Sequence, residues 1–194
     1  MKKHKKLWLV FLIQLNNVYF GHVRLSIIDT SSESNQPFVY GNTTMIFNGT
    51  IWNYRELREE LNIETKTSGD TEVLCAILDR YGIEGLNKVQ GMFAIAFTQG
   101  DGSITIVRDR HGEVPLHYSL LTGLFPSFSF CSEIKGLLAM GEIGQTVKML
   151  EPGSFINVSS KEIVKAKRPA IIIDNLILGS NTYQKAWNLL APKS

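Results

Sequence analysis

Short apolar runs separated by turn-forming residues predict a chain built mainly of strands. The run at residues 45–47 predicts a strand, and Asn48-Gly49 directly after it is a pair typical of a tight turn. Residues 92–97 and 103–108 flank a glycine-rich turn and predict a hairpin, and residues 155–158 predict a final strand. We therefore expect a sheet-based fold with short connections.

Helical spacing occurs in two places between these strands. Asn53 is a suitable N-cap with Glu56 three positions later to complete a capping box, and one face then carries Tyr54, Leu57 and Leu61. Asp70 is a suitable N-cap for a second helix that Gly82 ends, with an apolar stripe of Val73, Leu74, Ile77, Leu78 and Tyr81. Both helices are amphipathic and are expected to cover a sheet.

The later part of the chain carries further local signals. Residues 86–90 predict a short helix, and Ser132 is a suitable cap for a helix that runs to Met140. Arg108, Asp109 and Arg110 precede a glycine and a proline that mark a chain reversal. We interpret these three charges as structural groups under a loop.

Both ends depart from the pattern of the middle. Residues 2–6 are basic and residues 7–13 are apolar, which leaves open a secretory signal, a buried strand or a stretch that is not native sequence. The apolar run is too short to cross a bilayer. Near the other end, residues 171–173 could form a strand and residues 183–190 a helix. The expected organisation is an atypical segment, a domain and a tail without a motif, at residues 1–20, 21–167 and 168–194.

Composition narrows the function classes. With 194 residues and 44% hydrophobic content, the chain can bury a sizeable core. Its charge of +2 comes from the lysines at the start, and the remainder is slightly acidic, so no nucleic-acid surface is predicted. Cys75 and Cys131 lie in apolar surroundings and predict buried free thiols in a reducing, cytoplasmic compartment. The histidines lack the spacing of a metal site.

Three polar positions have both a structural and a chemical interpretation. Asn48-Gly49 is either a turn or a pair of donors, one side-chain amide and one backbone N–H, suited to an oxyanion. Arg24 is either a surface charge or a planar clamp for a carboxylate. Asp70 is either a helix cap or a partner for an ammonium group, and these two roles are compatible.

Ordered motifs decide between these interpretations. The motifs are Gly-His-Val-Arg-Leu-Ser-Ile-Ile-Asp at 21–29, Asn-Gln-Pro at 35–37, Phe-Asn-Gly-Thr-Ile-Trp-Asn-Tyr at 47–54, Ser-Gly-Asp-Thr-Glu at 68–72, Gly-Met-Phe-Ala at 91–94, Arg-Asp-Arg-His-Gly at 108–112, Ser-Glu-Ile-Lys at 132–135 and Glu-Pro-Gly at 151–153. Together they resemble class II glutamine amidotransferases, specifically the glutaminase half of asparagine synthetases, over roughly residues 21–167.

The resemblance implies a fold and a substrate. The fold is α+β, an N-terminal-nucleophile hydrolase-like four-layer sandwich of two antiparallel sheets between helix layers. The substrate is glutamine, with Arg24 on its carboxylate, Asp70 on its α-amino group, and Asn48 and Gly49 as the oxyanion hole. The resemblance also assigns to the substrate pocket Leu25, Ile27, Ile28 and Thr50. No cofactor is expected in this chain, because ATP and Mg would belong to the synthetase domain.

Departures from the family pattern affect the chemistry. The family uses an N-terminal Cys whose own α-amino group acts as base, whereas residue 2 here is Lys and neither Cys75 nor Cys131 can offer a free α-amino group. Thr50 stands where the family has Glu. No Ser-Gly-Gly-x-Asp pyrophosphate loop is present, which excludes ATP-dependent amide formation by this chain alone.

Three hypotheses follow from these departures. The first is a glutaminase domain that is truncated or inactive, and hence a pseudoenzyme. The second is a non-catalytic module that binds glutamine or a partner and regulates a separate synthetase subunit. The third is a gene remnant.

Overall fold

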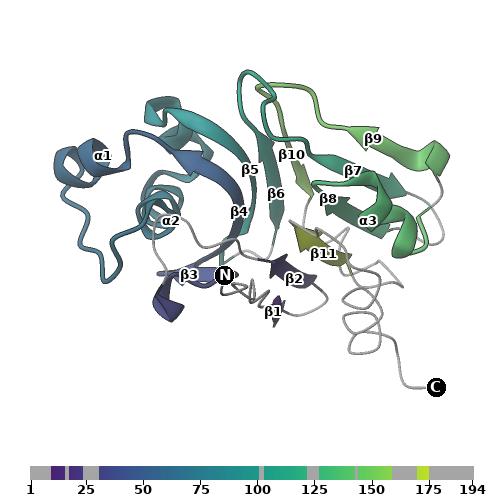
Figure 1. Ribbon diagram of the computed structural model, residues 1–194, viewed down its shortest axis with the longest axis horizontal. Coiled ribbons are helices and arrows are strands. Elements are labelled where there is room, and N and C mark those ends of the chain that lie inside the picture. Colours follow the sequence, from purple (N-terminus) through teal and green to yellow (C-terminus); the bar gives the residue numbers. More distant parts are fainter. Residues whose placement is uncertain are drawn as a thin grey trace, which may run out of the picture.

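The computed structural model describes residues 10–15, 18–23, 31–100, 103–121, 127–142, 144–158 and 170–174. Two sheets stand side by side in the middle of the molecule, with α1 and α2 beyond one sheet and α3 against the other (Figure 1). The α-helices are α1 (Tyr54–Glu60), α2 (Asp70–Tyr81) and α3 (Ile134–Ala139). Short 3-10 helices are η1 (Ser32–Ser34), η2 (Gly82–Lys88) and η3 (Gly144–Thr146). None of the helices in the described residues is long and apolar enough to span a membrane.

The five-stranded sheet is antiparallel throughout, in the order β10-β6-β5-β4-β3. Its strands are β3 (Phe38–Tyr40), β4 (Thr43–Ile51), β5 (Gly91–Thr98), β6 (Ile104–Arg108) and β10 (Phe155–Val158). The predicted hairpin is confirmed as β5 and β6, and the predicted final strand of the domain is confirmed as β10. The four-strand run from β10 to β4 forms the base on which the site is built.

The six-stranded sheet has the order β1-β2-β11-β8-β7-β9. Its strands are β1 (Val10–Leu15), β2 (Val18–Val23), β7 (His117–Leu121), β8 (Ser127–Cys131), β9 (Val147–Met149) and β11 (Ala170–Asp174). β11 lies between β2 and β8 and runs parallel to both, whereas the other described pairs of this sheet are antiparallel. The apolar run predicted at 7–13 overlaps β1 at 10–15, and the strand expected at 171–173 is confirmed as part of β11 at 170–174. The helix expected at 183–190 lies outside the described residues.

Two hydrophobic clusters hold these layers together. One lies between the five-stranded sheet and helices α1 and α2, where Phe47 and Ile95 meet Leu57, Leu74 and other buried side chains. The other lies between the two sheets, where residues of β4, β5 and β6 meet Phe20 of β2 and the rings of Phe128 and Phe130 on β8. Alternation along each strand therefore sends one set of side chains to the helices and the other to the opposite sheet.

Three local predictions are wrong and one is displaced. Asn48-Gly49 is no turn, because β4 continues through both residues and pairs with β5 as far as Ile51. Ser132 is not the cap of α3, whose N-cap is Glu133 and whose last residue is Ala139. The first residue of α2 is Asp70 itself, with Gly69 at the N-cap. The short helix expected at 86–90 is instead the end of η2.

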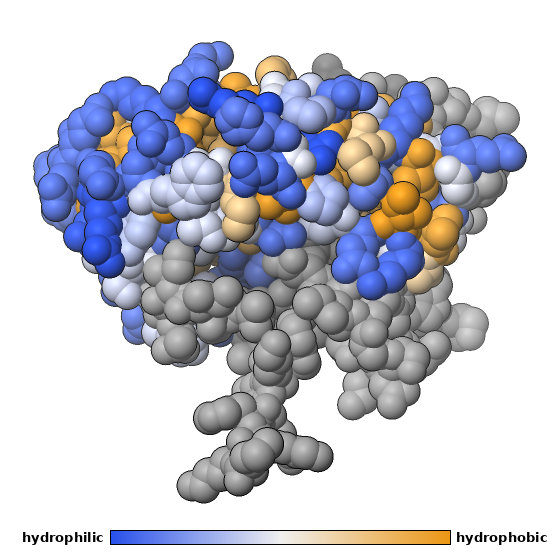
Figure 2. Space-filling view, turned by 45° about the horizontal axis from the view of Figure 1, so that its top comes forward, coloured by the Kyte–Doolittle hydropathy of each residue, from blue (hydrophilic) through white to orange (hydrophobic). Residues whose placement is uncertain are grey.

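On the face seen in Figure 2, the described surface is mainly hydrophilic, with separate hydrophobic patches among the polar side chains. Trp52 and Phe155 are two exposed aromatic side chains of this surface, each more than half exposed. They line a pocket of about 410 Å³ together with Phe93 and Val107. Both of these buried side chains belong to the hydrophobic cluster between the five-stranded sheet and helices α1 and α2. Asn48, Gly49, Thr50 and Asp70 do not line this pocket. The pocket is therefore separate from these four predicted site residues.

Candidate functional site

The second half of β4 forms an open edge, because β3 pairs with β4 only as far as Met45. Hydrogen bonds in an antiparallel ladder alternate, so every second residue directs its N–H away from the neighbouring strand. Phe47 does so and donates to Oε1 of Gln36 at 2.6 Å, and Ile51 does so and donates to Oδ2 of Asp70 at 2.9 Å. The same alternation directs the N–H of Gly49, midway between them, to this open edge.

Asn48 lies on the neighbouring position and turns its side chain toward the six-stranded sheet. It shares the inward face of β4 with Ile46, which is buried between the sheets. Its Nδ2 donates a hydrogen bond to Oγ of Ser132, just beyond the end of β8, at 3.1 Å. The amide is half-buried, and Ser132 is buried. Asn48 therefore bridges the two sheets at the same end of β4 where the Gly49 N–H is directed away from β5.

Asp70 faces this edge from the first residue of α2. It is buried, with 6% of its surface exposed, and one carboxylate oxygen accepts the hydrogen bond from Ile51. The N-cap position of α2 belongs to Gly69 and makes no side-chain cap hydrogen bond. The carboxylate therefore ties the start of α2 to β4, and the N-cap position predicted for Asp70 belongs to Gly69.

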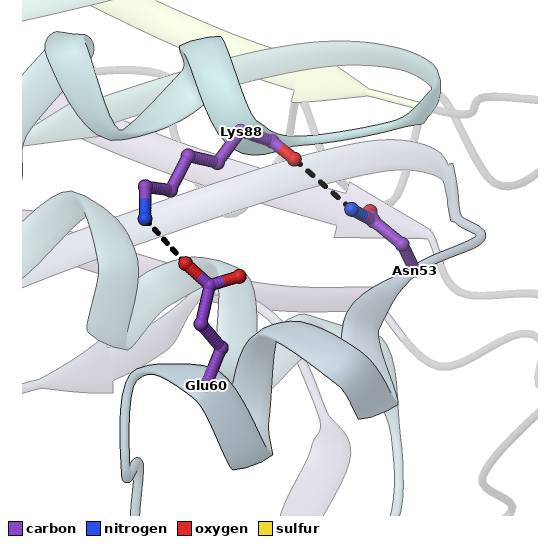
Figure 3. Close-up of polar contacts among 3 residues, drawn as sticks. All are labelled: Asn53, Glu60 and Lys88. Carbon is purple, nitrogen blue, oxygen red and sulfur yellow. Dashed lines mark hydrogen bonds and ion pairs between the residues drawn. The ribbon is translucent and has the colours of Figure 1, made fainter.

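Asn53 occupies the predicted N-cap position of α1, but its side chain bonds elsewhere. Its amide makes no cap hydrogen bond to α1. Instead, Nδ2 donates to the carbonyl oxygen of Lys88 at 3.0 Å (Figure 3). Oδ1 accepts from the N–H of Gln90 at 2.9 Å. Lys88 also forms an ion pair with Glu60 at the far end of α1, which raises the pKa of the lysine. Both contacts fix the segment that leads into β5.

Glycine is required where β4 and β5 meet at the site. Gly49 has φ of +144°, and a Cβ there would lie 2.0 Å from the carbonyl oxygen of Met92. A Cβ on Gly91 would lie 2.2 Å from the carbonyl oxygen of Thr50. Real Cβ atoms do not approach backbone oxygens this closely, so the two glycines set the spacing of the strands beside Asn48.

A buried loop supports the β5 side of the site. Arg108, 7% exposed, donates from Nε to the carbonyl of Val114 and from its two Nη atoms to the carbonyls of Leu150 and Gly112, at 2.7–2.9 Å. Asp109 is 1% exposed and accepts hydrogen bonds from backbone N–H groups of residues 93, 111, 113 and 114. The structural interpretation of Arg108 and Asp109 is thus confirmed.

The environment of Asp109 has two opposing effects on its ionisation. Burial favours the neutral form, but the hydrogen bonds from Val114, Glu113, His111 and Phe93 outweigh it, and the pKa of Asp109 is lowered. A carboxyl whose pKa is lower in the folded state stabilises the fold above its unfolded pKa. That stabilisation is lost as the pH falls through the pKa that Asp109 has in the folded state.

Replacement of this group gives a pH-dependent prediction. Asp109→Asn is expected to lower the free energy of unfolding at pH 7 by about 2 kcal/mol, because charge-assisted hydrogen bonds are lost. The difference from wild type should shrink below about pH 4, where the wild-type carboxyl also becomes protonated. Urea denaturation at pH 7 and pH 3 measures both values. Glu113→Gln, at an exposed neighbour, is the control, and an equal effect of both substitutions at pH 7 would contradict the assignment.

The predicted site residues fall into two groups. Asn48, Gly49 and Thr50 are consecutive on β4, and Asp70 contacts the same strand end, so the structure brings these four together. Arg24, Leu25, Ile27 and Ile28 lie outside the described residues, directly after the end of β2 at Val23. Sequence reasoning missed the roles of Gln36, Ser132 and Gly91, although all three stand within the motifs quoted above.

The other candidate chemistry is structural in the described residues. Cys75 and Cys131 are buried free thiols, as predicted, and burial raises the pKa of Cys75. No group of His, Cys, Asp and Glu side chains in the described ranges is arranged to hold a metal ion. His117 is buried and its Nδ1 lies 3.1 Å from the carbonyl oxygen of Ser132.

Comparison with known structures supports the fold. Glutamine phosphoribosylpyrophosphate amidotransferase from Bacillus subtilis superimposes with a TM-score of 0.58 at 23% identity, covering 73% of this chain and 33% of that one. A second structure, described as the allosteric regulatory enzyme of purine biosynthesis, gives a TM-score of 0.59 at 22% identity over the same shares. The expected N-terminal-nucleophile hydrolase-like α+β sandwich is confirmed.

Comparison with known sequences identifies relatives of greater length. A Methanocaldococcus jannaschii protein named as a glutamine-hydrolysing asparagine synthetase is 34% identical over 155 residues, which are 70% of this chain and 30% of the relative. Asparagine synthetase 1 of Bacillus subtilis is 41% identical over 128 residues, 63% of this chain and 20% of the relative. Asparagine synthetase 1 of Arabidopsis thaliana is 33% identical over 130 residues, which are 65% of this chain and 22% of the relative. The chain thus spans less than a third of the length of these relatives.

The family match covers most of the chain. Residues 10–163 match the glutamine amidotransferase domain family, from the first residue of β1 to beyond the end of β10. All the predicted site residues fall inside this match, and β11 falls outside it. The chain belongs to the glutamine amidotransferase domain family, of the type found in asparagine synthetases.

Proposed function

We propose that this chain binds glutamine at the open edge of β4, as the glutaminase domain of an asparagine synthetase type of protein. One observation supports this above the others: the Gly49 N–H and the Asn48 amide lie on consecutive residues of β4, at an edge where the described part of the chain places no further strand. Two such donors suit the γ-carbonyl oxygen of glutamine. The Asp70 carboxylate lies at the same edge and suits an ammonium group.

Arg24 completes the proposed site by resemblance to the family motif. A guanidinium gives a carboxylate two parallel hydrogen bonds, which fixes the orientation of an amino acid at its α-carbon end. Thr50 stands where the family has Glu, so the proposed recognition of the α-amino group depends on Asp70. The proposed binding needs no cofactor in this chain. ATP and Mg would serve a synthetase domain of the kind found in the longer relatives.

Calorimetry tests the binding proposal. We expect the full chain to bind L-glutamine and Arg24→Ala to reduce its affinity by roughly tenfold or more, because charge-assisted hydrogen bonds contribute about 1.5–3 kcal/mol. The matched control is Arg110→Ala, an exposed arginine, which should leave the affinity unchanged. Equal affinities of wild type and Arg24→Ala would show that Arg24 is only a surface charge.

We further propose that this 194-residue chain binds glutamine without hydrolysing it. Its two thiols are both buried, and a thiol with a raised pKa supplies little thiolate at neutral pH. Ammonia release from glutamine should therefore not exceed background. A turnover that Cys75→Ala abolishes would overturn this part. A form of the protein with an in-frame Met-Cys-Gly start is expected to hydrolyse glutamine, so the nucleotides upstream of Met1 are informative.

Binding without hydrolysis is the basis of the second candidate function. A chain of this kind could sense glutamine and regulate a separate synthetase subunit, which would restore the combination of domains seen in the longer relatives. The burial of both thiols favours this candidate over an autonomous glutaminase. Co-purification with a synthetase subunit, dependent on added glutamine, is the expected result.

A further inference from the structure

We infer that Ser132 is a positioning residue of the site, which sets the orientation of the Asn48 amide and so aims one of its N–H groups at the ligand. The inference rests on the proposed function, because it assigns a task to the same pocket. Its starting point is the 3.1 Å hydrogen bond from Asn48 Nδ2 to Ser132 Oγ, which crosses from one sheet to the other.

A primary amide can make this contact and still act on a ligand. Its NH₂ group has two donors in one plane, separated by a fixed angle. When one donor is held by Ser132, the plane of the amide and the direction of the second donor are both determined. Without that contact the side chain could rotate about its last bond, whose energy profile is broad, or exchange its oxygen for its nitrogen. An oxygen directed at a γ-carbonyl oxygen would repel it.

Ser132 is itself held firmly. It is 4% exposed, and its carbonyl oxygen lies 3.1 Å from Nδ1 of His117, which is 6% exposed on the adjacent strand β7. The imidazole can donate one hydrogen bond from Nδ1 to that carbonyl. Two contacts therefore connect His117 to Ser132 and Ser132 to Asn48. His117 and Ser132 are buried, and Asn48, at the proposed ligand site, is half-buried. A rigid support of this kind is what an oxyanion donor needs in order to act without reorganising.

Ser129 offers a matched control close by in the sequence. It is also buried, at 5% exposure, and lies within β8, whereas Ser132 directly follows the end of that strand. Its Oγ donates to Oε1 of Glu142, however, on the other face of the six-stranded sheet. Replacement of either serine by alanine removes one buried hydroxyl, but only Ser132→Ala removes the contact with Asn48.

Two ligands separate positioning from general stability. L-Glutamine engages the proposed donors through its γ-carbonyl, whereas L-norvaline has the same α-amino and α-carboxylate groups and no carbonyl in its side chain. We expect Ser132→Ala to lower the affinity for glutamine by roughly three- to tenfold, the effect of one hydrogen bond, and to leave that for norvaline unchanged. Ser132→Thr, which keeps the hydroxyl, should restore glutamine affinity. Ser129→Ala should change neither affinity.

The outcomes are distinguishable. Equal losses for both ligands in Ser132→Ala, or no loss for either, would overturn the positioning role while leaving glutamine binding in place. Failure of the wild-type chain to bind glutamine would overturn the proposed function itself. A measurement without ligand tests the contact directly: the side-chain amide resonances of Asn48, assigned with Asn48→Asp, should shift in Ser132→Ala and not in Ser129→Ala. Unshifted resonances in Ser132→Ala would overturn the inference.

Discussion

Replacing Gly49 with alanine is expected to lower the free energy of unfolding by about 3 kcal/mol or more, through backbone strain and overpacking together. The new Cβ would lie 2.0 Å from the carbonyl oxygen of Met92 and 2.8 Å from Cα of Phe93. Both obstacles are backbone atoms of β5, so no side-chain rotation can relieve the contact. β4 would have to separate from β5 beside Asn48.

Thermal unfolding provides the measurement. A loss of this size corresponds to a fall in melting temperature of roughly 6–12 °C for a chain of this length. Gly82→Ala is the control, because Gly82 also has positive φ, +56°, but nothing lies within 4 Å of its Cβ position. That variant should show the conformational cost alone, about 1–3 kcal/mol, because φ of 56° with ψ of −149° is a conformation that residues other than glycine rarely adopt. A Gly49→Ala protein no less stable than Gly82→Ala would mean that the strands are not packed as described.

Replacing Arg108 with methionine is expected to cost about 3–4 kcal/mol of stability, because three backbone carbonyls would lose their donors inside the protein. Those carbonyls belong to Gly112, Val114 and Leu150, on the loops that follow β6 and β9. Methionine keeps the apolar stem of the side chain, so the effect isolates the guanidinium. The loop that supports β5 should loosen before the helices do.

Urea denaturation and amide hydrogen exchange measure this effect. Arg108→Lys should be intermediate, because an ammonium group cannot reach three carbonyls that lie in the plane of a guanidinium. Arg110→Met, two residues further along and exposed, should change stability by no more than about 0.5 kcal/mol. Similar losses at positions 108 and 110 would contradict the assignment of Arg108 as the buried hub of these loops.

Elements with a strong local signal were predictable from the sequence. The apolar stripe that ends at Gly82 produces α2, and the glycine-rich turn after residue 98 produces the β5–β6 hairpin. Prediction failed where tertiary contacts override local preference. Asn48-Gly49 has turn composition, yet it lies within β4 because Gly49 is needed for close contact with β5, a requirement visible only once the strands are paired.

The sequence predicted which residues belong to the candidate site, but it did not predict which contacts they make. The motifs give Asn48, Gly49 and Asp70, but sequence spacing cannot show that Asp70 accepts from the backbone of β4. Ser132 has the composition of a helix cap, and its actual partner is 84 positions away in the sequence. Contacts of this kind depend on how the two sheets face each other, which no local pattern encodes.

Strand β11 connects the far end of the sequence to the middle of the six-stranded sheet. It pairs with β2, which the ribosome makes about 150 residues earlier, and with β8. Loop-closure entropy makes such distant pairing slow to form. During synthesis, every other described strand is complete before β11 leaves the ribosome. Until it arrives, β2 and β8 each present an unpaired edge to neighbouring nascent chains, so this is the stage at which the protein is most exposed to aggregation.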